Sequence, residues 1–150
     1  MAGLGVLAPT AAITMSSASG PITAWQAKAP ANQRIIVKQI TVSMNGVTAA
    51  EAPVLFDIVV QTTAGTMTSL TPVKKFGSDP ETIQSTYQHT ATVEPTTTDV
   101  KWREYYHEMT GGVMALKNIN VPGGGYLGVR YTSGTLTGTV KVSVSAEIEE

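Results

Sequence analysis

The sequence predicts an all-β protein, an antiparallel β-sandwich of jelly-roll type with an extended N-terminal arm. Threonine is the commonest residue, followed by alanine and valine, and threonine and valine suit a pleated, half-buried surface. Apolar and polar residues alternate with period two in most segments after Arg34. No alternation of strands with long helices is visible, which disfavours a parallel doubly wound sheet. An immunoglobulin-like sandwich is the alternative, because it would produce the same alternating pattern.

The size and charge of the chain limit the classes of function that we expect. The chain has 150 residues, enough for one domain with its own core. Its formal net charge is −1 and 14% of its residues are charged, against about 25% in typical soluble domains. Direct binding of nucleic acid is not expected, because it depends on clustered lysine and arginine. The lack of cysteine excludes disulfides and thiolate metal sites, and no apolar run predicts a membrane span.

The arm is predicted over residues 1–21 and the sandwich domain over 22–150. Glycine, alanine, serine and proline dominate the first segment, which cannot build a core alone. Four of its side chains would be poorly placed in water: Leu4, Val6, Leu7 and Ile13. We expect them to dock on a partner, with a disordered tail as the alternative. On this hypothesis, deleting residues 1–20 leaves a folded β-domain that no longer binds.

The first half of the domain contains three predicted strands. The segment 34–44 comes first, and Asn45-Gly46 after it is a strong turn signal. Four residues are expected to share its apolar face: Ile36, Ile40, Val42 and Met44. The segment 53–63 predicts a strand buried on one side and partly covered on the other. The weaker strand in 66–75 is expected at a sheet edge, because Pro72 cannot donate to a ladder.

In the second half, Ser78-Asp79-Pro80-Glu81 is a helix-start signal that supports one or two turns. Strand signals resume at Tyr87, with breaks at Pro95 and at Gly111-Gly112. The last strand alternates most cleanly, and five residues form its apolar face: Val140, Val142, Val144, Ala146 and Ile148. The whole pattern gives about eight strands with the turn spacing of a sandwich or barrel.

The segment VPGGGYLGVR contains glycines at 123, 125 and 128 that fit G-x-G-x-x-G. A dinucleotide-binding loop needs a helix after it, so that the helix N-terminus faces the phosphates. Here Leu127, Val129 and Tyr131 alternate as in a strand. We therefore interpret the glycines as a turn between two strands, and we predict no cofactor.

The side chains that could support catalysis lack the spacing of a known site. The histidines, His89 and His107, could form a metal site only with an aspartate such as Asp57, and no metal-binding motif connects them. We therefore predict no metal and no enzymatic activity. An enzyme with His89 or His107 at its centre is the alternative that the sequence supports least.

The segment KWREYY is a candidate for a contact with another subunit. Tryptophan, tyrosine and arginine carry much of the energy of protein interfaces, which singles out four residues: Trp102, Arg103, Tyr105 and Tyr106. The simpler interpretation is a strand whose amphipathic residues pack at a rim. A carbohydrate-binding face that uses Trp102 or Tyr126 is a further possibility.

Four segments carry a resemblance to a known group: APANQRIIVKQITVSMNG, AEAPVLFDIVVQTTAGTMTSLTPVKK, YQHTATVEPT and NVPGGGYLGVRYTS. Their order over residues 29–133 resembles that of small structural proteins of tailed bacteriophages. The resemblance implies a jelly-roll protein in the virion, of capsid decoration or cement type, at the outer capsid surface. It implies binding to the major capsid protein and self-association as a homotrimer or homodimer, without enzymatic activity. The alternative is a head-fibre or tail-accessory module that binds a receptor or carbohydrate.

Overall fold

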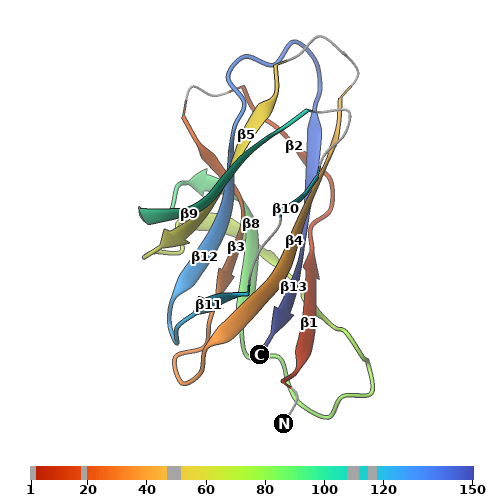
Figure 1. Cartoon of the computed structure of the whole chain (residues 1–150), viewed down its shortest axis with the longest axis vertical. Helices are drawn as coiled ribbons and strands as arrows, with labels where there is room; N and C mark the ends of the chain where they lie inside the picture. Colours follow the sequence, from red (N-terminus) through yellow and green to blue (C-terminus); the bar gives the residue numbers. More distant parts are fainter. Residues whose placement is uncertain (1–2, 18–19, 47–51, 108–111, 115–117) are drawn as a thin grey trace.

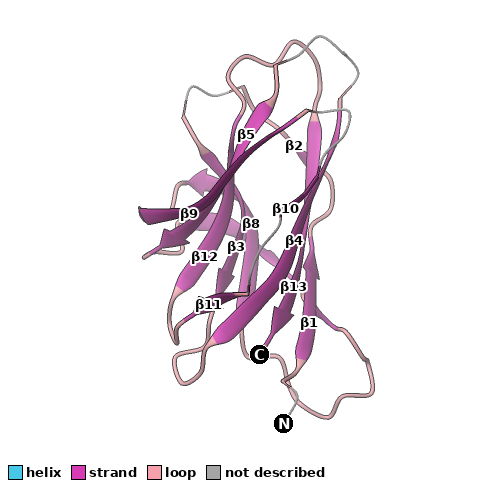
Figure 2. Ribbon diagram, in the orientation of Figure 1, coloured by secondary structure: helices cyan, strands magenta, loops and turns pink. Residues whose placement is uncertain are grey.

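The fold is a sandwich of two antiparallel sheets. The computed structural model describes the whole chain except residues 1–2, 18–19, 47–51, 108–111 and 115–117. In the described residues every regular element is a strand, and the sheets pack against each other (Figures 1 and 2). The prediction of an all-β sandwich is confirmed. No helix in this part of the chain is long and apolar enough to span a membrane.

The first sheet has seven strands. Its path runs β10 (Gly112–Met114), β4 (Ile35–Asn45), β13 (Lys141–Glu149), β1 (Gly5–Pro9) and β7 (Val73–Lys74). Two short strands lie off this path: β11 (Ile119–Val121) pairs with β4, and β2 (Ile13–Thr14) pairs with β13. Just before β1 and just after β13, Leu4 and Glu150 exchange two backbone hydrogen bonds of 2.9 Å (Figure 1).

The second sheet has six strands. Their order is β6 (Thr66–Leu70), β8 (Thr86–Val93), β3 (Ile22–Lys28), β12 (Tyr126–Thr132), β5 (Val54–Gln61) and β9 (Thr97–Tyr106). The segment before and after Pro72 supplies β6 and β7, which end the paths of different sheets. The prediction of an edge strand there is confirmed.

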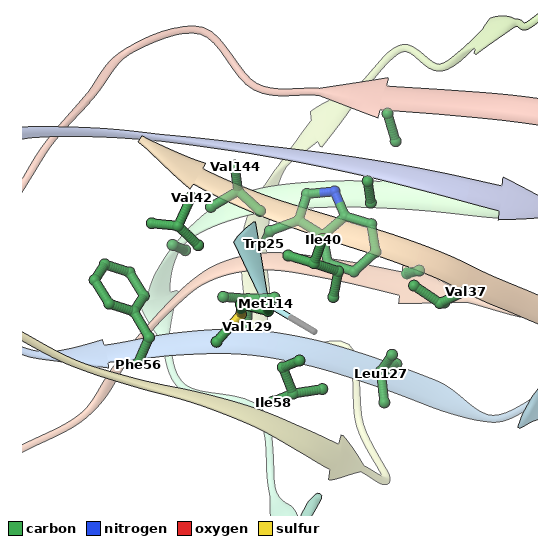
Figure 3. Close-up of a cluster of buried hydrophobic side chains, with 14 of the residues drawn as sticks. Trp25, Val37, Ile40, Val42, Phe56, Ile58, Met114, Leu127, Val129 and Val144 are labelled. Carbon is green, nitrogen blue, oxygen red and sulfur yellow. The ribbon is translucent and has the colours of Figure 1, made fainter. Parts of the chain in front are cut away.

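The core fills the space between the sheets. Trp25 and Ile40 lie between the ribbons, with Ile58, Leu127 and Val129 on the side of β5 and β12 (Figure 3), and all five are almost completely buried. Burying each such side chain contributes about 1.5–3 kcal/mol. This apolar layer holds the strands together without a disulfide.

A bulge in β4 corrects the predicted face of that strand. Gln39 pairs with Glu147 and Val37 with Ile148, which leaves Lys38 without an opposite residue. Because one extra residue reverses the alternation, Val37 points into the core and Ile36 is only half buried. Ile40 and Val42 are buried as expected.

The predicted helix after Ser78 does not form. The chain turns instead, with the Asp79 amide donating to the Phe76 carbonyl over 3.1 Å and the Lys74 ammonium donating to the Asp79 carbonyl over 2.7 Å. A helix nucleus fixes several residues for one hydrogen bond. Without an apolar stripe to bury, a single capping signal does not offset that entropy.

The N-terminal segment is part of the sandwich, so the predicted arm needs a correction. Strand β1 pairs with β13 on one side and with β7 on the other. Leu4, Val6 and Ile13 are buried in the core of their own chain, while Leu7 points outward and is half buried. The three buried side chains belong to the core cluster of their own chain, so they need no partner to leave water.

The glycine segment forms the predicted turn, between β11 and β12. The Gly125 amide donates to the Pro122 carbonyl over 2.8 Å, and Gly124 has a φ of +74°, a conformation that favours glycine. Gly128 serves a different purpose inside β12. A Cβ at that position would lie 2.3 Å from Oε1 of Gln61, whose side chain therefore lies flat across the glycine.

The six-stranded sheet carries a buried polar network on the face turned away from the core. The Gln26 amide donates to Gln61 Oε1 over 2.7 Å, and the Gln61 amide donates to Thr23 Oγ1 over 3.1 Å. The Glu94 carboxylate completes the chain by accepting from the Thr23 hydroxyl and backbone amide over 2.7 and 2.9 Å. All three uncharged residues are almost fully buried, so each hydrogen bond replaces one to water.

Candidate interaction surface

Strand β9 is one of the two edge strands of the six-stranded sheet. It pairs with β5 along its length and crosses it in Figure 1, and no strand of the described residues covers its other edge. Three large apolar side chains on this strand are exposed: Val100 by 38%, Trp102 by 39% and Tyr105 by 66%. Together with Arg103 they form what we call the β9 surface, which covers both faces of the strand: Val100, Arg103 and Tyr105 share one face, and Trp102 lies on the other.

Hydrogen bonds to Asp57 hold the side chain of Arg103 in place. Its Nε donates to Asp57 Oδ1 over 2.7 Å, and the Arg130 guanidinium contacts Asp57 Oδ2 over 3.0 Å. The three residues lie directly opposite one another on β9, β5 and β12. The Asp57 carboxylate is 4% exposed and, by its hydrogen bond and its charge, raises the pKa of Arg103. Two guanidinium groups share one carboxylate, so the cluster keeps one positive charge.

The opposite side of β9 has its own anchor. Glu104 Oε2 accepts from the Trp102 indole over 3.1 Å and from the Tyr106 hydroxyl over 2.8 Å. The Tyr106 ring lies 5.9 Å from that of Phe56 and is 8% exposed. Burial raises the pKa of Tyr106, and Glu104 adds to the effect. Tyr106 was predicted as a contact residue, but it belongs to the rim of the core, which is a correction.

The backbone edge of β9 is poorly suited to pairing with another strand. The ladder to β5 skips Lys101 and Thr98, and such bulges twist an edge away from regular geometry. Lys101 and Asp99 form an exposed ion pair on this edge, which by hydrogen bond and charge lowers the pKa of Asp99. Bulges and charges of this kind oppose edge-to-edge pairing, so contacts here should be made by side chains.

The predicted contact residues do not form one site. Trp102, Arg103 and Tyr105 lie together on β9, whereas the N-terminal four belong to the other sheet. Leu7 alone of those four faces outward, in a shallow hollow it shares with Pro9 and Gln39. The sequence singled out the N-terminal four by their apolarity alone. Burial in the structure separates them from the exposed residues of β9.

The histidines are not brought into a common site either. His89 lies on β8, where its ring nitrogen Nδ1 is 2.9 Å from the Thr90 hydroxyl. His107 directly follows β9, and three strands separate β9 from β8 in the sheet. Across the described ranges, no three His, Asp or Glu side chains gather closely enough to hold a metal ion.

Sequence reasoning missed Asp57 as the anchor of the β9 surface. The signal was an aspartate between apolar residues of a strand covered on both faces. A carboxylate in that position requires a buried partner. The sequence could not say which arginine supplies it, because that depends on the register of β9 and β12.

Comparison with known proteins identifies no relative. No protein-family model matches the chain, and searches of curated proteins and of solved structures give no significant match.

Proposed function

We propose that this chain is a non-enzymatic structural protein of a tailed-phage virion, of capsid decoration or cement type. In this proposal it binds neighbouring major capsid subunits on the outer surface of the shell through the β9 surface. The resemblance of four sequence segments to small phage structural proteins supports the virion part. The exposed tryptophan, tyrosine and valine of an edge strand support the binding part, and they carry the proposal.

The anchoring of β9 favours an interface role over an incidental exposure. Arg103 is fixed by Asp57, and Trp102 by Glu104. Side chains that are ordered before binding lose less entropy when a partner covers them. A rigid aromatic and arginine surface therefore suits a protein that clamps neighbouring subunits.

The finer fold assignment also belongs to this proposal. We infer jelly-roll connectivity from two stretches of strand order, β1-β13-β4-β10 and β3-β12-β5-β9. In both, each strand lies beside one that is distant in the chain. Strands β6 and β8 extend the second stretch beyond β3.

Assembly into symmetric copies would multiply a modest contact. A homotrimer or homodimer on a capsid symmetry axis would present two or three β9 surfaces at once. Linked contacts raise the overall affinity without new interactions.

The test uses capsids purified without the chain and the recombinant protein added back. We expect saturable binding by the wild type and at least about tenfold weaker binding by the double variant Trp102→Ala/Tyr105→Ala, because interface aromatics commonly contribute this much. The matched control is Val73→Ala/Phe76→Ala, which removes similarly exposed apolar side chains on and just after β7.

Two results would count against the proposal in different ways. If the β9 double variant binds as well as the wild type, the contact with the capsid must lie elsewhere on the molecule. A wild-type chain that is absent from purified virions and does not bind shells would exclude the capsid role altogether.

A further inference from the structure

A hollow on the outer face of the six-stranded sheet is lined by three neighbouring strands, β8, β3 and β12. Its volume is about 140 Å³ and its lining is Gln26, Lys28, Ala64, Thr86, Gln88 and Tyr126. Five of these six residues belong to strands. Sites built on strands are more rigid than sites built on loops, so the shape of this hollow is largely set before any ligand arrives.

A second hollow of about 300 Å³ shares Lys28, Thr86 and Tyr126 with the first. It continues toward the turn at Gly124 and toward Gln84. The two hollows adjoin at these three residues, and we call them together the cleft; the second alone reaches the small end of the roughly 300–1,000 Å³ that small-molecule sites occupy.

The rim of the cleft carries an aromatic ring and a cation in contact. The Lys28 ammonium lies 5.4 Å from the centroid of the Tyr126 ring, within the range of a cation–π interaction. The two side chains face each other from paired positions on β3 and β12.

One residue that lines the cleft, Gln88, has an unused acceptor. Gln26 is committed to the polar network, since its amide donates to Gln61 and to the Thr63 carbonyl over 2.7 and 3.0 Å. Gln88 lies opposite Gln26 on β8, and its Oε1 is buried with no hydrogen-bond partner in the described structure. A buried acceptor without a partner is destabilising. The terminal torsion of glutamine is broad, so the amide can turn its oxygen toward a ligand.

We propose that this cleft binds a saccharide. A sugar hydroxyl would donate to Gln88 Oε1, a ring or hydroxyl oxygen would accept from the Lys28 ammonium, and an apolar sugar face would pack on Tyr126. The combination of neutral amides, a hydroxyl, one aromatic ring and a single cation fits a polyhydroxylated ligand better than a strongly charged or wholly apolar one. The cleft is separate from the β9 surface, so this proposal does not depend on the capsid role.

The experiment is a two-dimensional NMR titration of the full chain with glucose, galactose, mannose, N-acetylglucosamine and glucuronate. At least one probe should produce saturable shifts at millimolar concentration in the side-chain amides of Gln26 and Gln88. Gln88→Leu should weaken that binding about tenfold, and Tyr126→Ala should weaken it as well. Gln39→Leu is the matched control, because Gln39 lies on the other sheet.

A second readout separates a binding role from a structural one. Removing an unpartnered buried acceptor should leave the melting temperature of Gln88→Leu unchanged or raise it, while binding is lost. Should that variant fail to fold, Lys28→Met carries the test with the same expected loss of affinity, largest for glucuronate. The absence of saturable shifts with every probe, or shifts that persist in the cleft variants, would overturn the proposal.

Discussion

Strands β1 and β9 were both predicted to contact partners, and the structure treats them in opposite ways. Strand β1 has a neighbour on each side and buries Val6 and Ala8 completely. Strand β9 has one neighbour and leaves most of its side chains exposed. Apolar side chains hold β1, whereas on β9 the Asp57 carboxylate anchors Arg103 and the Glu104 carboxylate anchors Trp102. Exposure on an ordered strand, rather than apolarity in the sequence, therefore marks the candidate surface.

The largest expected effect separates the two strands directly. Val6→Asp places a charge in the core and should cost more than about 4 kcal/mol, a large part of the roughly 5–15 kcal/mol that stabilises a domain. Val6→Ala gives a graded version at about 2 kcal/mol. Urea unfolding followed by circular dichroism measures both.

The matched change on β9 is Tyr105→Asp, which should alter stability by no more than about 0.5 kcal/mol, because the side chain is exposed. A fully folded Val6→Asp protein would mean that β1 leaves the sheet easily. The predicted partner-binding arm would then deserve a new test.

The second prediction concerns the anchor of β9. Asp57→Asn leaves Arg103 and Arg130 without their shared charge and should cost about 2–3 kcal/mol. Hydrogen exchange should quicken in β9 more than in β1, since of these two strands only β9 contacts this carboxylate. Asp99→Asn is the control, because that ion pair is exposed. Equal acceleration in both strands would show that Asp57 supports the whole sandwich rather than β9.

The sequence was informative about β-structure and poor at deciding which apolar residues face a partner. Alternation placed Ile40 and Val42 in the core correctly, because period two reports burial directly. It misplaced Ile36, since a bulge at Lys38 reverses the phase without leaving a sequence signal. The N-terminal residues were misjudged because their burial depends on β13, more than a hundred residues away. Arg103 was found by residue type, but its anchor Asp57 required the strand register.

The third prediction uses the raised pKa of Tyr106 on β9. The folded state holds the phenol proton more tightly than the unfolded chain, whose tyrosines titrate near 10. The stabilisation is therefore complete below pH 10 and is lost as the pH rises above it. The slope of the unfolding free energy against pH in this range reports the difference in bound protons between the two states. Tyr106→Phe should reduce that difference by up to one proton per molecule. Buried Tyr87 and Tyr131 also have raised pKa values, so the remaining slope should persist. An identical slope in wild type and variant would show that Tyr106 ionises without disturbing β9.

The smallest effect is expected where β1 meets a surface charge. Glu149 lies opposite Gly5, and its hydrogen bond to Lys38, with the charge of that lysine, lowers its pKa. The ion pair of 2.7 Å stabilises the fold above the pKa of the unfolded carboxyl and is lost as the pH falls through the lowered value. Both side chains are about one-third exposed, and such pairs contribute little. Glu149→Gln should therefore change the unfolding free energy at neutral pH by less than about 0.5 kcal/mol, and added salt should shrink the difference. A loss comparable to that of Val6→Ala would instead mean that charge, and not burial, secures the start of β1.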